Sequence, residues 1–241
     1  MPQFLIPPGK REGDLIRLDS EESHHVRDVF RKKRGDKIRL FDGEGGRFFA
    51  EIKSLNKREV SILLLRKLAS EMPKGTLKIA QALLRREKME LVIQKAVELG
   101  VSSLHPFTSS RTIVKQEKGQ KLGRWQKIAD EAAKQCGRGS QMKVDLAVPF
   151  DDLLKNLNAN MKLIFWEEGG EPIRNFFRRG EMGLAPTIIA LIGPEGGFSR
   201  EEIESGKENG FVVLSLGKNI LRAETAALAA TTLIQYELGN L

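Results

Sequence analysis

The chain is poor in cysteine and contains no long apolar run. Cys136 is the only cysteine among 241 residues, which excludes an internal disulfide and favours a reducing compartment. No apolar stretch approaches the ~20 residues of a membrane span. Residues 1–8 also lack the basic and long apolar segments of a signal peptide. We therefore expect a cytoplasmic protein without a membrane span.

Metal-binding side chains are equally sparse. His24 and His25 are neighbours in sequence, His105 is distant, and a single cysteine completes no ligand set, so we expect no metal. The two adjacent histidines either contact a ligand or stabilise the local fold. Cys136 ends an apolar helical stripe, and we expect it in the core.

Positive charge is in excess, and much of it lies near the N-terminus. The net charge is +8, and residues 1–70 hold 16 Lys and Arg against 11 Asp and Glu. The densest group, called the basic cluster below, is Arg31, Lys32, Lys33 and Arg34. Such a surplus in a small domain is typical of a protein that binds a phosphate backbone. A solvated surface segment is the alternative, and charge alone does not distinguish RNA, DNA and an acidic protein.

Residues 1–70 have the pattern of a small domain made mostly of strands. Strands are expected at residues 15–18, 37–41, 47–52 and 59–65, separated by turn signals such as Asp42-Gly43. A short helix is expected between the first two of these strands, with Ser20 as its N-cap. Residues 68–75 have the composition of a linker.

From residue 76 to 241 the pattern alternates between strands and helices, which predicts an α/β domain. Apolar residues recur with the helical period over residues 89–99 and 122–136. Gly100 stands where a left-handed residue would end the first of these helices. Ser199 followed by Glu202 is a capping-box pattern and predicts the start of another helix. The final helix, residues 224–238, is rich in alanine and so allows close packing.

Two glycine-containing loops follow short apolar runs in the last quarter of the chain. The runs are residues 188–192 and 211–216, and each ends at a glycine and leads toward a helix. Ligands of open α/β sheets bind beyond the carboxyl ends of the strands, and a backbone without Cβ can approach them closely. Neither loop is a Walker A or a dinucleotide-binding motif. Together they predict a cleft for a nucleotide-like cofactor, whereas either loop alone fits an ordinary turn.

The amino-acid sequence of these loops resembles that of a known family. Gly-Pro-Glu-Gly-Gly at residues 193–197, followed by Leu-Gly-x-x-Ile-Leu-Arg-x-Glu-Thr-Ala at residues 216–226, is similar to the RsmE-type 16S ribosomal RNA uridine-N3 methyltransferases. Residues 94–101, 106–111 and 124–138, and the His-His-x-x-x-Val-x-Arg pattern near residue 24, extend the resemblance almost end to end. After Arg138 the chain lacks the proline that is usual in this family.

The resemblance implies the fold, the reaction and the partners. The fold would be a small PUA-like β-barrel at residues 1–70, which binds RNA, followed at residues 76–241 by a SPOUT-class α/β methyltransferase domain with a trefoil knot. The enzyme would move a methyl group from S-adenosyl-L-methionine to N3 of a uridine in 16S ribosomal RNA, within the assembled 30S subunit. It would be a homodimer.

The predicted site residues follow from the loops and the resemblance. Cofactor contacts are expected from Leu191, Ile192, Gly193, Gly196, Gly197, Leu216, Gly217, Ile220, Leu221 and Glu168. RNA contacts are expected from His25, Arg31, Lys32, Lys33, Arg34, Arg111 and Arg138, although the last two also suit surface ion pairs. Arg222 is expected to stabilise negative charge on the uracil oxygens. Glu195 either accepts the N3 proton, positions Arg222, or interacts only with the dipole of the helix after Ser199.

Two other functions fit parts of this pattern. The first is methylation of a ribose 2′-hydroxyl or of another base, since the first loop is shared with ribose methyltransferases of the same class. The second is a non-catalytic RNA-binding or ribosome-assembly factor. The presence of both glycine loops and of Arg222 argues against the second.

Overall fold

The computed structural model describes residues 3–6, 9–56, 59–69, 73–114, 120–180 and 183–241. The chain forms two compact units. Unit 1 comprises residues 1–72 and 130–141, and unit 2 comprises residues 73–129 and 142–241. The expected division assigned residues 130–141 to the second domain, but the structure groups this segment with the first. None of the helices in the described ranges has both the length and the apolar content needed to cross a membrane.

Unit 1 is built on a six-stranded sheet in the order β1-β4-β5-β6-β3-β2. The strands are β1 (Gln3–Leu5), β2 (Arg11–Glu12), β3 (Leu15–Arg17), β4 (Lys37–Phe41), β5 (Arg47–Leu55) and β6 (Val60–Leu68). Neighbours pair antiparallel except β1 and β4, which are parallel. Alternate residues of β4 and β5 are buried, as expected when one face of each strand covers a core.

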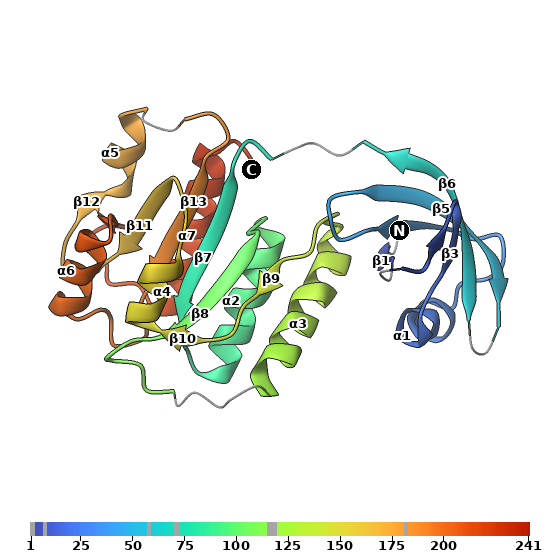
Figure 1. Cartoon of the computed structure of the whole chain (residues 1–241), viewed down its shortest axis with the longest axis horizontal. Helices are drawn as coiled ribbons and strands as arrows, with labels where there is room; N and C mark the ends of the chain where they lie inside the picture. Colours follow the sequence, from blue (N-terminus) through green and yellow to red (C-terminus); the bar gives the residue numbers. More distant parts are fainter. Residues whose placement is uncertain (1–2, 7–8, 57–58, 70–72, 115–119, 181–182) are drawn as a thin grey trace. The chain divides into compact units, whose positions relative to one another are not determined.

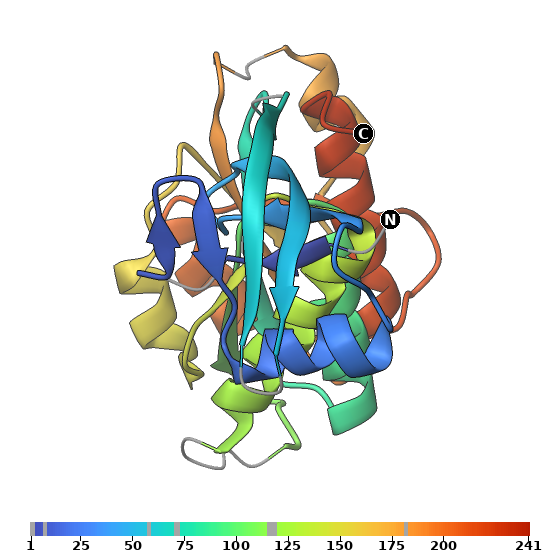
Figure 2. The same cartoon turned by 90° about the vertical axis from the view of Figure 1, so that its right-hand side faces the viewer.

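One helical segment connects β3 to β4 in this unit. It consists of α1 (Ser20–His24) and the π-helical turn η1 (His25–Val29), which lie along one end of the strands in Figure 2. Ser20 was expected to be the N-cap, but the cap is Asp19, whose side chain accepts a hydrogen bond of 2.8 Å from the Glu22 amide. The Asp19 carboxylate satisfies a free amide of the first turn, so Ser20 becomes the first helical residue.

Unit 2 contains a parallel sheet in the order β10-β8-β7-β13-β11-β14-β12, with β9 beside β8 (Figure 1). The strands are β7 (Thr76–Ala82), β8 (Ser103–Thr108), β9 (Lys143–Val144), β10 (Val148–Pro149), β11 (Met161–Phe165), β12 (Glu171–Pro172), β13 (Thr187–Ile192) and β14 (Val212–Ser215). β13, at the centre of the sheet, is apolar from Ile188 to Ile192, as expected for a strand whose two faces are both covered by helices.

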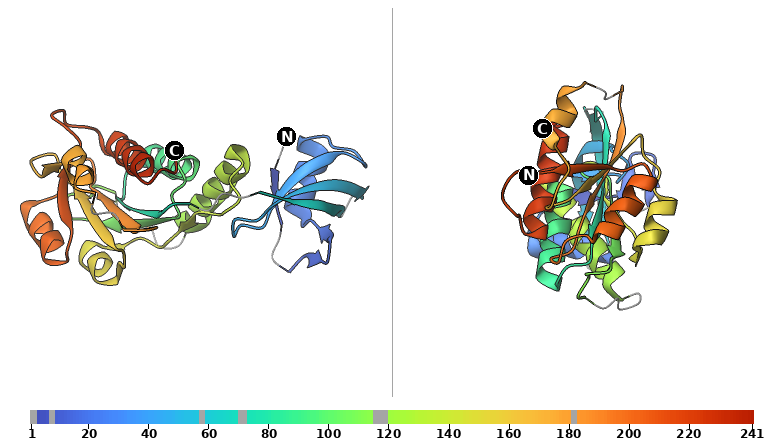
Figure 3. Two further views of the ribbon diagram at one scale, coloured as in Figure 1. Left: turned by 90° about the horizontal axis from the view of Figure 1, so that it is seen from above. Right: turned by 90° about the vertical axis from the view of Figure 1, so that its left-hand side faces the viewer.

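Helices flank this sheet on both sides, as Figure 3 shows. The helices are α2 (Arg86–Glu98), α3 (Gln120–Cys136), α4 (Phe150–Asn156), α5 (Ile173–Arg178), α6 (Arg200–Glu208) and α7 (Ala223–Glu237). On one face α7 packs against α2, β7 and β13. On the other face α4 and α6 share a core with β7, β8, β11 and β13.

Several local predictions for these helices are confirmed and one is wrong. Gly100 follows α2 with a φ of +80°, and Ser199 and Glu202 form the complete capping box of α6. Cys136 was expected in the core but is exposed. It is the last residue of α3, and Gly137, with a φ of +78°, turns the chain directly after it.

Candidate functional site

The main candidate site is a pocket at the carboxyl ends of three adjacent strands. β13, β11 and β14 are neighbours in the sheet, and the loop that follows each of them contributes to the pocket. The pocket is partly enclosed and opens to solvent. Its walls are formed by Phe165, Trp166, Glu167, Ile192, Gly193, Pro194, Glu195, Gly197, Ser215, Leu216, Gly217, Asn219, Leu221, Ala223 and Ala226.

Most of the residues predicted for this site line the pocket. Those that do are Ile192, Gly193, Glu195, Gly197, Leu216, Gly217 and Leu221. Leu191 instead points into the core shared with α4 and α6 and is fully buried. Ile220 is 81% exposed and lies outside the lining. Side chains alternate along a strand, so Leu191 and Ile192 face opposite sides of β13.

The acidic residue that lines the pocket after β11 is Glu167 and not the predicted Glu168. Glu168 is half-exposed, and its carboxylate lies 3.8 Å from the Arg200 guanidinium. Glu167 lies against the loop of residues 193–197, because a Cβ added to Gly197 would stand 1.8 Å from Glu167 Oε1. Glu168, the predicted cofactor contact, therefore lies outside the pocket lining, one position after Glu167.

The first glycine loop, residues 193–197, is a tight turn that favours glycine at its last position. The Gly197 amide donates a 3.0 Å hydrogen bond to the Pro194 carbonyl, and Gly197 has a φ of +68°, in the left-handed region. Phe198 then enters the core, where its ring stacks on Phe107 at 6.2 Å. Gly196 was predicted to face the cofactor, but its missing Cβ faces Arg111 at 3.1 Å, and it does not line the pocket.

Side chains from distant parts of the chain support this loop. Gln81, fully buried at the end of β7, donates from Nε2 to the Gly193 carbonyl at 3.3 Å, while its Oε1 has no hydrogen-bond partner in the described structure. Arg111 donates to the Gly196 carbonyl at 3.1 Å, and the Ser110 amide donates to Glu202 at 2.7 Å. Nothing in the sequence distinguishes Gln81, because the residues around it have the pattern of an ordinary buried strand.

The second glycine loop, residues 216–222, has less support. Ser215 Oγ and the backbone of Gly217 exchange hydrogen bonds of 3.2 and 3.3 Å. Gly217 has a φ of +136°, and no atom lies within 4 Å of the position that its Cβ would occupy. The three residues that follow are exposed. This loop therefore offers its backbone to the pocket without tight packing around it.

Arg222 and Glu195 flank the pocket from the two loops. Arg222 is the exposed N-cap residue of α7 and lies outside the lining, between the lining residues Leu221 and Ala223. Within the part of the chain that the structure describes, its guanidinium has no hydrogen bond or ion pair. Glu195 lines the pocket, and its carboxylate is 3.5 Å from the Lys88 ammonium.

Trp166 is a lining residue that the sequence analysis did not select. It follows β11, and its backbone amide donates to the Leu214 carbonyl at 3.0 Å. Its indole Nε1 is buried and has no partner among the described residues. A buried indole N–H normally has an acceptor, so this unpartnered donor in a lining residue is an exception. Across the described ranges, no group of three or more His, Cys, Asp or Glu residues is arranged to hold a metal ion.

The basic cluster of unit 1 lies in the loop between η1 and β4. Arg31, Lys33 and Arg34 are exposed and Lys32 is half-buried. Arg31 has a φ of +49°, and the Lys33 amide donates to the Asp36 carboxylate at 3.0 Å, which shapes the loop. Phe30, next to the cluster, is 49% exposed, although its ring also contacts Phe4 edge-to-face at 5.4 Å. Cations beside an exposed aromatic ring suit a nucleic-acid surface.

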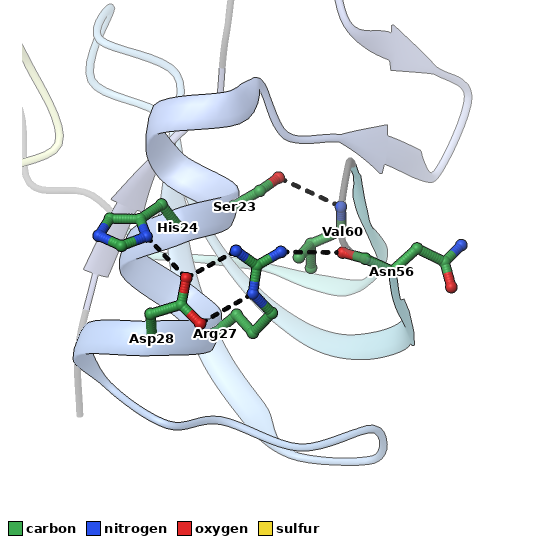
Figure 4. A network of polar contacts seen from close by, with 6 residues as sticks. All are labelled: Ser23, His24, Arg27, Asp28, Asn56 and Val60. Carbon is green, nitrogen blue, oxygen red and sulfur yellow. Dashed lines mark hydrogen bonds and ion pairs between the residues drawn. The ribbon is translucent and has the colours of Figure 1, made fainter.

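A polar network anchors the helical segment that precedes the basic cluster (Figure 4). Arg27 donates to Asp28 at 2.6 and 2.9 Å and to the Asn56 carbonyl at 3.1 Å, and His24 Nδ1 lies 2.6 Å from Asp28. The Arg27 guanidinium lowers the pKa of Asp28 to about 2, and His24 contributes to the same shift. His24 thus has a structural role, whereas the predicted RNA contact His25 is half-buried at the start of η1.

Arg138, another predicted RNA contact, is partly buried in unit 1. Its Nε donates to Ser140 Oγ at 2.8 Å, and its carbonyl accepts a 2.7 Å hydrogen bond from Gln3. Burial lowers the pKa of the Arg138 guanidinium. The adjoining residues are held to the β4–β5 turn, where the Gly45 amide donates to Gly139 at 3.1 Å.

Comparison with known proteins identifies close relatives of both units. The sequence matches the RNA methyltransferase domain family over residues 70–235 and the RNA methyltransferase PUA domain family over residues 18–65. It is 33% identical over 232 residues to ribosomal RNA small subunit methyltransferase E of Rickettsia conorii, covering 95% of this chain and 92% of the relative. The Bacillus subtilis protein of the same name is 32% identical, with 94% and 91% covered.

Solved structures agree with these matches. Ribosomal RNA small subunit methyltransferase E of Neisseria gonorrhoeae, bound to S-adenosyl methionine, superposes with a TM-score of 0.87 at 30% identity, covering 98% of this chain and 97% of that chain. A methyltransferase of Legionella pneumophila, solved with the bound cofactor SAM, gives a TM-score of 0.86 at 32% identity, with 97% and 96% covered.

Proposed function

Because the chain belongs to the family of ribosomal RNA small subunit methyltransferases E, we propose that it transfers a methyl group from S-adenosylmethionine to N3 of a specific uridine in 16S ribosomal RNA. The observation that carries the proposal is the pocket at the ends of β13, β11 and β14. Both glycine loops line it, and Arg222 and Glu195 flank it from either side. The N-terminal unit carries the PUA-like domain of the family, and the larger unit its methyltransferase domain.

The pocket suits S-adenosylmethionine. Ile192, Leu216 and Leu221 supply apolar surface for the adenine, and the backbone of the glycine loops supplies hydrogen-bonding groups for its edge. The unpartnered Trp166 indole and the Glu167 carboxylate add a donor and an acceptor for the polar groups of the cofactor. When bound, the cofactor supplies an electrophilic methyl group carried on a sulfonium.

The uridine must lose its N3 proton as the methyl group is transferred, and negative charge then spreads onto its carbonyl oxygens. The unpaired guanidinium of Arg222 would stabilise that charge, as donors do in an oxyanion site. The Glu195 carboxylate, at the opposite loop, would accept the proton or orient the base. Arg111, which reaches the glycine loop, would meet the RNA backbone near the target base.

The N-terminal domain, residues 1–70, would hold the RNA. The basic cluster offers cations to the phosphates, and Phe30 offers a ring on which a base can stack. We propose the assembled 30S subunit in the cytoplasm as the substrate. His25 and the partly buried Arg138 are weaker RNA contacts in this scheme, since each is partly enclosed by unit 1.

We also propose a trefoil knot and a homodimer for the α/β domain of residues 76–241. The strand order inserts β13 between β7 and β11, and α7 returns to pack on α2, β7 and β13, which agrees with a threaded C-terminal segment. Leu91 on α2 and Leu233 and Tyr236 on α7 are 39%, 40% and 68% exposed on these adjoining helices. A second copy of the chain would cover these apolar side chains.

The decisive experiment incubates the purified protein with methyl-labelled S-adenosylmethionine and small subunits that lack the modification, followed by nucleoside analysis. We expect labelled 3-methyluridine. A labelled product in which one RNA linkage resists alkaline cleavage would identify ribose 2′-O-methylation instead. Failure to bind S-adenosylmethionine in calorimetry, with 30S binding retained, would identify a non-catalytic RNA-binding factor.

A further inference from the structure

Lys88 occupies an unfavourable position for a cation unless it serves a tertiary purpose. It is the third residue of α2, and the first turn of a helix carries partial positive charge from its free amides. A lysine there raises the electrostatic energy of the helix end. Its ammonium must therefore be stabilised by groups from elsewhere in the chain.

Those groups are two carboxylates, one associated with each loop of the pocket. The Lys88 ammonium lies 3.5 Å from Glu195 Oε1 and 3.3 Å from Glu224 Oε2. The three side chains are 30%, 23% and 14% exposed, so the group is largely shielded from water. Glu224 Oε2 is buried and has no hydrogen bond in the described structure. Its negative charge is therefore compensated by the Lys88 ammonium at 3.3 Å.

This three-residue group adjoins the predicted reaction centre. Glu195 lines the pocket from the first glycine loop. Glu224 lies two residues after Arg222, on the first turn of α7, whose Ala223 and Ala226 also line the pocket. Lys88 thus connects the two walls of the pocket through charge.

We propose that Lys88 is a positioning residue for methyl transfer, which keeps the Arg222 guanidinium unpaired and available to the uracil. The proposal rests on the proposed function. Without the ammonium, two carboxylates would face each other with no cation between them. Arg222, the nearest cation in sequence to Glu224, would turn toward them and away from the substrate.

The alternative is that Lys88 forms only a structural ion pair. The two roles differ in what a second substitution does. If Lys88 acts by holding carboxylates away from Arg222, removing one of those carboxylates should restore part of the activity lost with Lys88. If Lys88 acts only by stabilising the fold, Lys88→Met should lower the melting temperature and the rate together, and removing Glu224 as well should restore both together, because it removes a buried carboxylate that has lost its cation.

The test uses single-turnover methyl transfer to 30S subunits, calorimetric binding of S-adenosylmethionine, and melting temperature, on the full chain. Lys88→Met should lower the transfer rate about 10- to 100-fold, the effect expected when a catalytic group is slightly misplaced, with cofactor affinity changed less than about threefold. Lys88→Met/Glu224→Gln should recover at least about threefold of that loss. Lys88→Arg, which keeps the charge, should retain most of the rate.

Lys95→Met is the matched control, because Lys95 lies on the same helix and pairs with the neighbouring Glu98 at 2.9 Å. It should leave the transfer rate unchanged. A Lys88→Met variant with normal rate overturns the proposal, as does a rate that is not improved by Glu224→Gln, or one that falls and recovers only in step with melting temperature and cofactor affinity. A wild-type protein that binds cofactor but transfers no methyl group refutes the proposed function itself, and the role of Lys88 with it.

Discussion

Replacing Gly197 by alanine tests the pocket most directly, because the structure separates two consequences of the added methyl group. Gly197 has a φ of +68°, a conformation that an L-residue adopts at a cost of about 1–2 kcal/mol. Its Cβ would also stand 1.8 Å from Glu167 Oε1, so that flexible carboxylate must leave the pocket wall. The first effect lowers stability, and the second changes the site.

We expect Gly197→Ala to lower the free energy of unfolding by about 1–2 kcal/mol, since the backbone strain exceeds the gain from a stiffer unfolded chain. Affinity for S-adenosylmethionine should fall about tenfold, the equivalent of one charged hydrogen bond. Denaturant unfolding measures the first quantity and titration calorimetry the second.

Two further variants isolate these effects. Gly210→Ala introduces the same kind of strain, at a φ of +82°, with no atom within 4 Å of the new Cβ and outside the pocket. It should lose similar stability and keep normal cofactor affinity. Glu167→Ala should lose affinity without losing stability, and adding it to Gly197→Ala should cause no further loss. Unchanged cofactor affinity in Gly197→Ala would refute the assignment of Gly197 and Glu167 to the cofactor site.

Three other variants test the remaining parts of the scheme. Arg222→Ala should slow single-turnover methyl transfer ~10²-fold or more, while cofactor affinity and melting temperature stay unchanged. Arg222→Lys should recover only part of the rate, and a near-normal rate in Arg222→Ala would end the catalytic assignment. Replacing the basic cluster by glutamine should weaken 30S binding and flatten its salt dependence without affecting cofactor affinity; an unchanged salt slope would make the cluster an ordinary solvated surface. Burial lowers the pKa of His105, so protonation opposes folding, and the free energy of unfolding should rise with pH up to the ordinary histidine pKa near 6.5. In unfolding experiments, His105→Gln should remove this slope, which is at most about 1.4 kcal/mol per pH unit. A slope that persists in the variant would contradict the assignment.

The elements were largely predictable because their signals are local. The capping box of Ser199 and Glu202 and the left-handed glycine after α2 depend on residues within a turn of one another. The assignment of residues 130–141 to unit 1 was not predictable, because α3 continues without interruption across the division between the units. Cys136 shows the limit of helical periodicity, which assumes that the buried face continues to the last turn.

The pocket was predictable to the level of its loops but not of every side chain. The two glycine loops are contiguous motifs, so their backbone role could be inferred from sequence. Whether Glu167 or Glu168 faces the ligand depends on the orientation of the chain as it leaves β11, which no motif encodes. Lys88 and Gln81 are far in sequence from the loop residues that they contact. Gln81, for example, donates to the Gly193 carbonyl across 112 positions of sequence. Such partners are brought together only by the strand order.

The two loops of the pocket are held so differently that they suit different tasks. The first loop accepts hydrogen bonds from Gln81 and Arg111, and Phe198 packs in the core directly after it. Its backbone is therefore fixed before any ligand binds. The second has only the Ser215–Gly217 hydrogen bonds, and exposed residues follow them. Segments with few buried contacts open at low free-energy cost, whereas preorganised ones bind without that cost. A fixed first loop is appropriate for a small cofactor that is bound in every cycle. The second loop also lines the cofactor pocket, and in the proposed scheme its less constrained end at Arg222 is appropriate for a base that must enter from a large RNA and leave again as product.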